Sequence, residues 1–278
     1  MAKVSAPICT ACGSEFAEAE KLPESCPICQ DDRQFVPPSG QAWTTLDAIS
    51  RKHFNSYRYV EPAILGMVTT PQFAIGQRAL LIRTPQGNLL WECLSLLDQA
   101  TVDIVKGLGG IAGIAISHPH YYSTMVEWSR EFNAPIHLHA ADKKWVMRPD
   151  SSIQFWEGDT KPLFDGLTLI RCGGHFAGAT VLHSQKAGNG SGAIMTGDVV
   201  MVVPNRNHVS FMRSYPNLLP LSAPSVQAIG DVLAPFKFEA IYGAFFDRDI
   251  RAGGKQIIER SVKRYIDTVR GDGSAERL

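Results

Sequence analysis

Four cysteines in two pairs near the start of the chain constrain its folding more than any other feature. Cys9 and Cys12 form one CxxC unit, Cys26 and Cys29 form a second, and thirteen residues lie between the units. Four thiolates at this spacing can close tetrahedrally around one ion. Paired CxxC units are more typical of a metal site than of free thiols or two disulfides. We therefore predict a compact metal-binding knuckle.

The knuckle resembles zinc ribbons. It is also similar to the rubredoxin-like tails of rubrerythrins, which have a CPxC second unit after a short loop, as Cys26-Pro27-Ile28-Cys29 does here. Thiolates are soft ligands that suit both zinc and iron. Zinc would make the unit a folding staple or a docking module, whereas iron would make it a one-electron carrier. We predict zinc, with iron as the alternative.

The chain length allows one globular domain and a small appendage. Of its 278 residues, 45% are hydrophobic, which is enough to form a large core without disulfides. A Pro-rich polar stretch at 36–40 predicts the boundary between a knuckle at 1–40 and a larger domain at 41–278. Cys93 and Cys172 are single residues in apolar strands, and we expect them in the core.

Charge and hydropathy exclude some partners. The chain has 27 basic and 27 acidic side chains and no basic run interleaved with aromatic residues, which argues against a nucleic-acid partner. The first thirty residues lack the layout of a signal peptide, and no apolar run approaches the roughly 20 residues that span a bilayer. We expect no membrane partner and a reducing cytoplasm, where clustered cysteines more often hold metal.

The pattern after the knuckle alternates between strands and helices. A Thr-Pro-Gln-Gly-Asn turn at 84–88 separates two apolar strands at 79–83 and 89–93. The alternation predicts an α/β or α+β class with a layered sheet core. Helices are expected at 102–108, 124–132 and 254–269, and further strands at 111–116, 135–138, 167–172, 180–184, 193–196 and 240–242.

Three histidines and an aspartate follow predicted strands. His118 and His120 share one short loop, where extended backbone directs residues i and i+2 to the same side. His175 follows two glycines that allow close backbone approach, and Asp198 follows the strand at 193–196. Three histidines and a carboxylate at strand ends are the ingredients of a catalytic zinc site with an open position for water.

The order and local context of these residues resemble the metallo-β-lactamase superfamily over about residues 60 to 270. The resemblance implies an αββα sandwich with metals at one edge of its two sheets. His118 and His120 match the first two positions of the family's HxHxDH motif. His175 matches the later Gly-His element, and Asp198 matches the aspartate that bridges two metals.

Three departures from the family pattern concern one metal. Tyr122 stands at the motif's aspartate and Ser123 at its last histidine, and residues 241–246 lack the family's final histidine. These groups would hold the second metal, whereas all four ligands of the first remain. We therefore predict a single zinc or other divalent ion on the three histidines. Asp198 would be its fourth ligand or a catalytic general base.

Other polar residues have two interpretations. The hydroxyl of Tyr122 could orient a water or a developing oxyanion, which would make Tyr122 catalytic, or its ring could fill the space of the missing metal. His139 could contact substrate or act as an extra metal ligand, but a strand-end histidine bonded to backbone is the favoured interpretation. Asp247 or Arg248 could bind an anionic substrate, although a salt-bridged loop is favoured there.

These observations predict a mononuclear metal-dependent hydrolase acting on a small ester, thioester or lactone. Two alternatives belong to other functional classes. An iron-loaded knuckle could pass electrons to the second domain, which would make the chain a redox protein. A zinc knuckle that docks a partner, with a degenerate pocket that holds a ligand, would make it a non-catalytic binding module.

Overall fold

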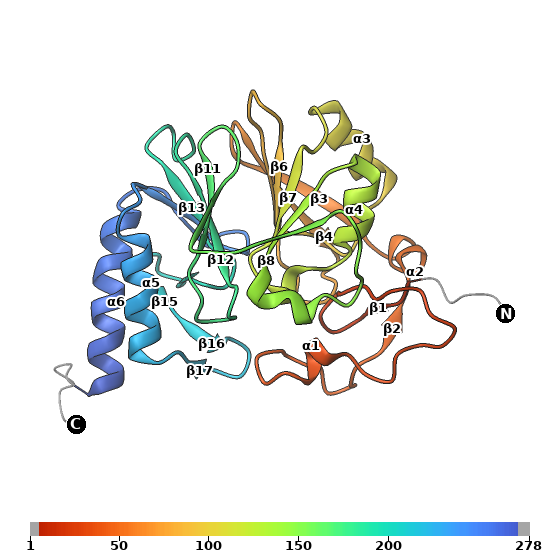
Figure 1. The fold of residues 1–278 in the computed structure, drawn as a ribbon, viewed down its shortest axis with the longest axis horizontal. Helices are drawn as coiled ribbons and strands as arrows, with labels where there is room; N and C mark the ends of the chain where they lie inside the picture. The colour runs from red at the N-terminus through yellow and green to blue at the C-terminus, as the bar shows by residue number, and fades with distance from the viewer. Residues whose placement is uncertain (1–5, 272–278) are drawn as a thin grey trace. The chain divides into compact units, whose positions relative to one another are not determined.

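The structure is a computed structural model that describes residues 6–271. The chain forms two compact units, with the boundary between Trp156 and Glu157. We call them unit 1 and unit 2 in chain order. Figure 1 shows their elements coloured along the chain.

Unit 1 contains a seven-stranded sheet whose strands lie in chain order from β3 to β9. Strands β3 to β6 are antiparallel, and β6 to β9 are parallel. Helices α3 and α4 connect parallel strands and lie against one face of the sheet (Figure 1). The elements are β3 (Phe54–Glu61), β4 (Ile64–Thr70), β5 (Ala79–Ile82), β6 (Leu89–Trp91), α3 (Gln99–Gly107), β7 (Gly113–Ala115), η1 (Pro119–Tyr121), α4 (Met125–Phe132), β8 (Ile136–His139), η2 (Ala140–Trp145) and β9 (Ile153–Trp156).

Local sequence signals explain the predicted elements of this sheet. The turn between β5 and β6 contains Gly87 at φ 128°, a conformation that favours glycine. Helix α3 begins at Asp98, whose side chain accepts a hydrogen bond from the Thr101 amide at 2.8 Å. It ends before Gly109 and Gly110, as the sequence predicts. These strands and helices are confirmed, with ends shifted by a few residues.

The knuckle belongs to unit 1. It contains β1 (Ile8–Cys9) and α1 (Pro27–Gln30). β2 (Trp43–Thr44) and α2 (Leu46–Ser50) follow it, and β1 pairs with β2. Its buried cysteines pack with Trp43, Ile75, Trp145 and Met147, which all come from the rest of the unit. The domain boundary at residue 40 stays a prediction.

Unit 2 contains a six-stranded sheet in the order β10-β11-β12-β13-β18-β19. All neighbours are antiparallel except β13 and β18, which run parallel. The elements are β10 (Thr160–Pro162), β11 (Leu167–Arg171), β12 (Thr180–Ser184), β13 (Ala193–Met195), β14 (Met201–Val202), β15 (Val209–Ser210), β16 (Met212–Ser214), β17 (Leu219–Pro220), α5 (Ala223–Leu233), β18 (Ala240–Tyr242), β19 (Asp249–Ile250) and α6 (Gly254–Arg270).

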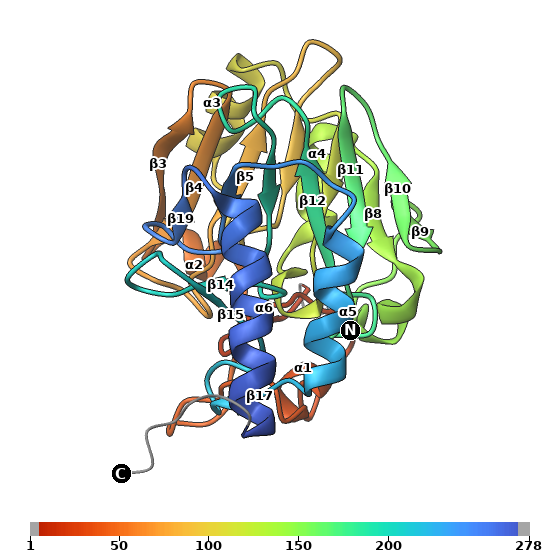
Figure 2. The same ribbon diagram turned by 90° about the vertical axis from the view of Figure 1, so that its left-hand side faces the viewer.

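Helices α5 and α6 run side by side in unit 2 (Figure 2). The predicted C-terminal helix is confirmed as α6, which ends at Gly271 in the left-handed conformation. Helix α5 was not predicted, although Ser222 caps it by accepting a hydrogen bond from the Ser225 amide at 3.4 Å. The Ser-Ala-Pro-Ser sequence at 222–225 is a helix-start signal that could have located it.

Both units combine helices with sheets, so the predicted α/β class is confirmed. Among residues 6–271, no helix has both the length and the apolar character that a membrane crossing requires.

Candidate metal centres

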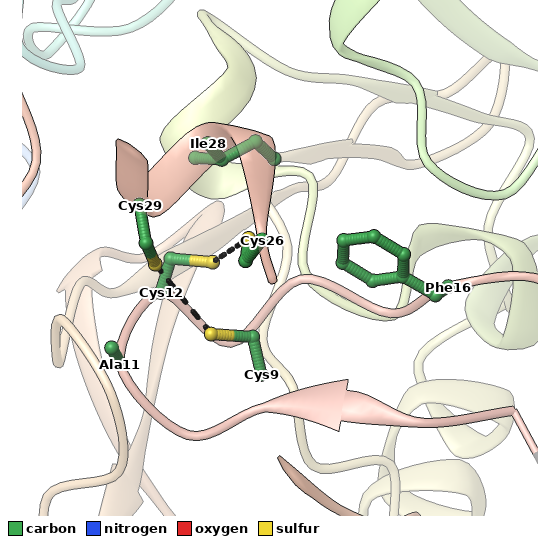
Figure 3. Close-up of a cluster of buried hydrophobic side chains, with 7 residues drawn as sticks. All are labelled: Cys9, Ala11, Cys12, Phe16, Cys26, Ile28 and Cys29. Atoms are coloured by element: carbon green, nitrogen blue, oxygen red, sulfur yellow. Dashed lines mark hydrogen bonds between the residues drawn. The ribbon is translucent and has the colours of Figure 1, made fainter. Parts of the chain in front are cut away.

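The four knuckle cysteines point their sulfur atoms toward one another (Figure 3). The sulfurs of Cys9 and Cys29 lie 3.5 Å apart, and those of Cys12 and Cys26 lie 3.7 Å apart. Zinc–sulfur bonds of about 2.3 Å in a tetrahedron place sulfurs about 3.8 Å apart. The donor set and its spacing therefore fit a tetrahedral metal site.

The thiol chemistry supports the same interpretation. A disulfide needs sulfurs about 2.05 Å apart, and all four residues are free thiols, so the pairs are not disulfides. Hydrogen bonds from Cys12 lower the pKa of the Cys9 and Cys26 thiols, whereas the bond to Cys26 raises the pKa of Cys12. The hydrogen bonds thus favour thiolates at Cys9 and Cys26, whereas the pKa values of Cys12 and Cys29 are raised, and a bound cation would favour the thiolate at all four positions.

Glycine and acidic residues after the first CxxC unit connect the knuckle to the rest of unit 1. The hydroxyl of Ser95 donates to the Gly13 carbonyl at 2.9 Å. The amide of Glu15 donates to the Ser123 carbonyl at 3.0 Å, and the Glu15 carboxylate pairs with Arg148. The knuckle is therefore held at several points near the loop that contains the first two histidines.

That loop, residues 117–124, is called the histidine loop below. It follows β7 and includes the single turn η1, and its residues His118 and His120 are buried. Their ring centroids lie 5.1 Å apart. The Nδ1 atom of His118 lies 2.7 Å from the Ser117 hydroxyl, and the Ser117 amide donates to the Glu92 carboxylate at 3.1 Å. These bonds fix the ring direction of His118.

Unit 2 contributes His175 and Asp198, which are both buried. Nδ1 of His175 is 3.1 Å from the Met212 carbonyl oxygen. Because a carbonyl can only accept a hydrogen bond, a neutral His175 ring carries its proton on Nδ1. The lone pair then lies on Nε2, which is 3.9 Å from a carboxylate oxygen of Asp198. A histidine oriented through its outer nitrogen, next to a carboxylate, is the arrangement found around metal ligands.

The chain therefore has two groups of residues that could hold a metal ion. One contains the four cysteines. The other contains three histidines and one aspartate. His118, His120, His175 and Asp198 are the residues that the sequence singled out for the second group, but their roles as ligands stay predictions.

Tyr122 and Ser123 follow the two histidines in the histidine loop and lie next to knuckle residues. Burial raises the pKa of Tyr122 well above its usual value, and the charges of Asp142 and Glu92 add to the effect. Tyr122 and Ser123 line a cavity of about 10 Å³ together with knuckle residues such as Ile28. This packing supports the interpretation in which the Tyr122 ring fills space, and its catalytic role stays a prediction.

Tyr215 is a site residue that the sequence did not indicate. Its ring centroid lies 6.0 Å from that of His175, and its pKa is raised by burial and then by the charge of Asp198. It follows the short strand β16, whose Met212 carbonyl orients His175. No spacing rule connects Tyr215 with His175, because they are brought together by tertiary folding.

The remaining candidates include one histidine and two buried cysteines. Nδ1 of His139 accepts a hydrogen bond from the Ala141 amide at 3.2 Å, which is the backbone partner that the favoured interpretation requires. Cys93 and Cys172 are buried, as predicted for core residues. Burial raises the pKa of the Cys172 thiol to about 12, so it stays protonated. Anion binding by the turn at 247–248 stays untested.

Comparison with known proteins gives a close sequence relative and several structural neighbours. No family model matches the sequence. The uncharacterized protein YmaE of Bacillus subtilis (strain 168) is 45% identical over 267 residues, which cover 95% of this chain and 97% of that protein.

The structural neighbours are metallo-β-lactamases. DIM-1 has a TM-score of 0.58 at 12% identity, covering 77% of this chain and 98% of its own. An enzyme from Cronobacter sakazakii with a HARLDQ motif has a TM-score of 0.51 at 16% identity, covering 80% and 95%. At such low identity the likeness shows the fold alone, and it confirms the fold that the sequence resemblance implied.

Proposed function

Because this chain belongs to the same family as YmaE and has the metallo-β-lactamase fold, we propose that it is a metal-dependent hydrolase. The observation that carries the proposal is the ligand set of three histidines and an aspartate. The likeness to DIM-1 covers 77% of the chain, which is more residues than either unit contains, and so it extends into both units.

We propose that His118, His120, His175 and Asp198 bind one metal ion rather than two. The residues at the family's second-metal positions are used differently here. Tyr122 is buried against the knuckle, and the Ser123 carbonyl accepts a hydrogen bond from the knuckle. Neither residue offers the carboxylate or imidazole that a second ion would need.

Hydrolysis would use the residues of this site in separate roles. A metal ion on the histidines would supply Lewis-acid chemistry, which polarises a carbonyl oxygen and lowers the pKa of water. Asp198 would either complete the ligand set or, as a general base next to the ion, accept a proton from the attacking water. The hydroxyl of Tyr122 is protonated at neutral pH, as expected for a tyrosine with an ordinary or raised pKa, and it would donate a hydrogen bond to the developing oxyanion.

We propose small esters, thioesters or lactones as the substrate class, and a reducing compartment as the place of action. The six cysteines support the proposal of a reducing compartment, because all of them are free thiols.

For the knuckle we propose zinc, a metal that four thiolates at the observed sulfur spacing would accommodate.

The test combines elemental analysis with turnover of a panel of esters, thioesters and lactones. We expect two metals per chain, one of which is lost in His118→Ala together with turnover. His208→Ala is the matched control, because His208 lies in the turn between β14 and β15, away from the proposed ligands. Full turnover in His118→Ala would overturn the proposal, and iron in the knuckle would favour a redox function instead.

A second variant tests the role of Tyr122. In Tyr122→Phe we expect unchanged metal content and a kcat lowered by about ten-fold or more, as for loss of an oxyanion donor. Unchanged kcat would assign the ring to packing and would leave the proposed hydrolase intact.

A further inference from the structure

The knuckle and the histidine loop contact each other closely within unit 1. Gly13 has φ 80°, and a Cβ at this position would lie 2.3 Å from the Ser95 hydroxyl, which donates to the Gly13 carbonyl. Thr124, at the end of the histidine loop, donates to the Ser95 carbonyl at 3.3 Å. The first CxxC unit is thereby connected to the histidine loop through a single residue, Ser95.

A second and more direct connection runs through Ser123. The Glu15 amide donates to the Ser123 carbonyl at 3.0 Å. The Ser123 hydroxyl donates to the Cys93 carbonyl at 3.2 Å and lies 3.1 Å from the donating side-chain nitrogen of Gln77. Ser123 has φ 47°, a left-handed conformation that costs free energy unless the surroundings hold it. The hydrogen bond from the Glu15 amide is one of the contacts that hold Ser123 in this conformation.

The side chain of Glu15 adds an anchor on the other side of the loop. It pairs with Arg148, which also pairs with Glu127 in the first turn of α4. Helix α4 begins two residues after Ser123, so Glu15 binds both the loop and, through Arg148, the helix that follows it. Arg148 and Glu15 are both buried, so these ion pairs are shielded from solvent.

His120 lies within the turn η1 and only three residues before Ser123, so the short segment between them can absorb little movement. A displacement of Ser123 would therefore change the directions of the two histidines. Groups that orient metal ligands without touching the metal typically change metal affinity by 10- to 100-fold when they are removed.

We propose that Glu15 is a positioning residue through which the knuckle, ordered by its own metal, sets the directions of His118 and His120. The inference rests on the proposed metal at the histidine site. It gives the knuckle a purpose other than electron transfer or partner docking, because occupancy of the cysteine site controls metal affinity at the histidine site.

The experiment titrates the metal-free full-length protein with Co²⁺. Bands of thiolate-to-cobalt charge transfer report the knuckle, and d–d bands of cobalt with nitrogen and oxygen ligands report the histidine site. Glu15→Ala keeps the backbone hydrogen bond to Ser123 but removes the ion pair with Arg148, and we expect it to weaken cobalt binding at the histidine site by about ten-fold or more. Glu15→Gln should recover most of the affinity, since its amide oxygen still accepts a hydrogen bond from Arg148.

Two further variants make the test specific. Cys12→Ser, which damages the knuckle itself, should weaken the histidine site as Glu15→Ala does. Glu24→Ala is the matched control, because Glu24 is an exposed acid between the same two CxxC units, and it should leave both sites unchanged. If Glu15→Ala does not fold, Cys12→Ser and Glu15→Gln decide the question.

The outcomes separate the two proposals. If the wild-type histidine site binds no cobalt, the proposed hydrolase fails. If it binds cobalt, and Glu15→Ala and Cys12→Ser bind it equally well, the positioning role of Glu15 is overturned while the proposed function remains.

Discussion

Glu15 and Glu127 share the single guanidinium of Arg148 at a buried position. One positive charge cannot fully compensate two carboxylates there. Burial raises the pKa of Glu15 to about 7, and the opposing attraction of Arg148 does not restore the usual value. Sequence could not predict this group, since Glu15 and Arg148 come together through folding from opposite ends of unit 1.

The pKa of Glu15 predicts a pH-dependent contribution to stability. Between pH 4.5, the ordinary value for glutamate, and about 7, the folded protein binds a proton that the unfolded chain releases. The stability that this carboxyl contributes to the folded protein is therefore fully present below pH 4.5, and it is lost as the pH rises to about 7. The difference in free energy of unfolding between Glu15→Gln and wild type should therefore change in favour of Glu15→Gln by about 2 to 3 kcal/mol as the pH rises from 5 to 8.

Urea unfolding of both proteins at these two pH values measures that difference. Glu24→Gln is the control, because the exposed Glu24 should give the same difference from wild type at both pH values. A difference between wild type and Glu15→Gln that does not change with pH would show that Glu15 is ionised throughout.

The turn between β12 and β13 shows how an element positions a site residue. Strand β13 leads to Asp198, and it pairs in parallel with β18, which lies some forty residues later in the chain. Gly192, at the start of β13, has φ 85°, and a Cβ there would lie 2.5 Å from the Lys237 carbonyl. Only glycine allows the two segments to approach this closely.

Gly192→Ala should therefore destabilise unit 2. Both the left-handed backbone and the clash with the Lys237 carbonyl oppose the new methyl group, and we expect a loss of roughly 2 to 4 kcal/mol in free energy of unfolding. Gly190→Ala is the matched control, since Gly190 has φ 88° but nothing within 4 Å of an added Cβ, so its loss should be about 1 kcal/mol. Equal losses in urea unfolding would show that the close approach is unimportant.

The elements were predictable to different degrees for physical reasons. Strands such as β11 and β12 and the amphipathic helix α6 have strong local patterns, and all were predicted. The short strands β14 to β17 contain two or three residues each, too few for any periodicity, and they were missed. Tyr215, which follows one of them, was missed for the same reason.

At the scale of the whole molecule, the fold and both groups of candidate ligands were predicted from spacing and family resemblance. What the sequence could not predict is the contact between the knuckle and the histidine loop. The contact depends on pairs such as Gly13 with Ser95 and Glu15 with Ser123, which no local rule connects.

Metal removal should therefore affect stability as well as chemistry. The free energy of metal binding to a folded thiolate site is also free energy of folding, because the unfolded chain does not hold the four sulfurs together. A strong chelator should lower the unfolding temperature by roughly 10 °C, given that about 1 kcal/mol corresponds to 2–4 °C in a domain of this size. The knuckle core, with its four buried cysteines, should account for most of this loss.

Thermal unfolding with and without chelator in three proteins assigns the effect to one site. Wild type and His118→Ala should both show a large decrease, since each keeps the cysteine metal. Cys12→Ser should unfold at a lower temperature from the start and respond little to chelator, because its knuckle has lost a ligand. If Cys12→Ser instead loses as much stability to chelator as wild type does, the stabilising metal lies at the histidine site. The knuckle would then fold without an ion.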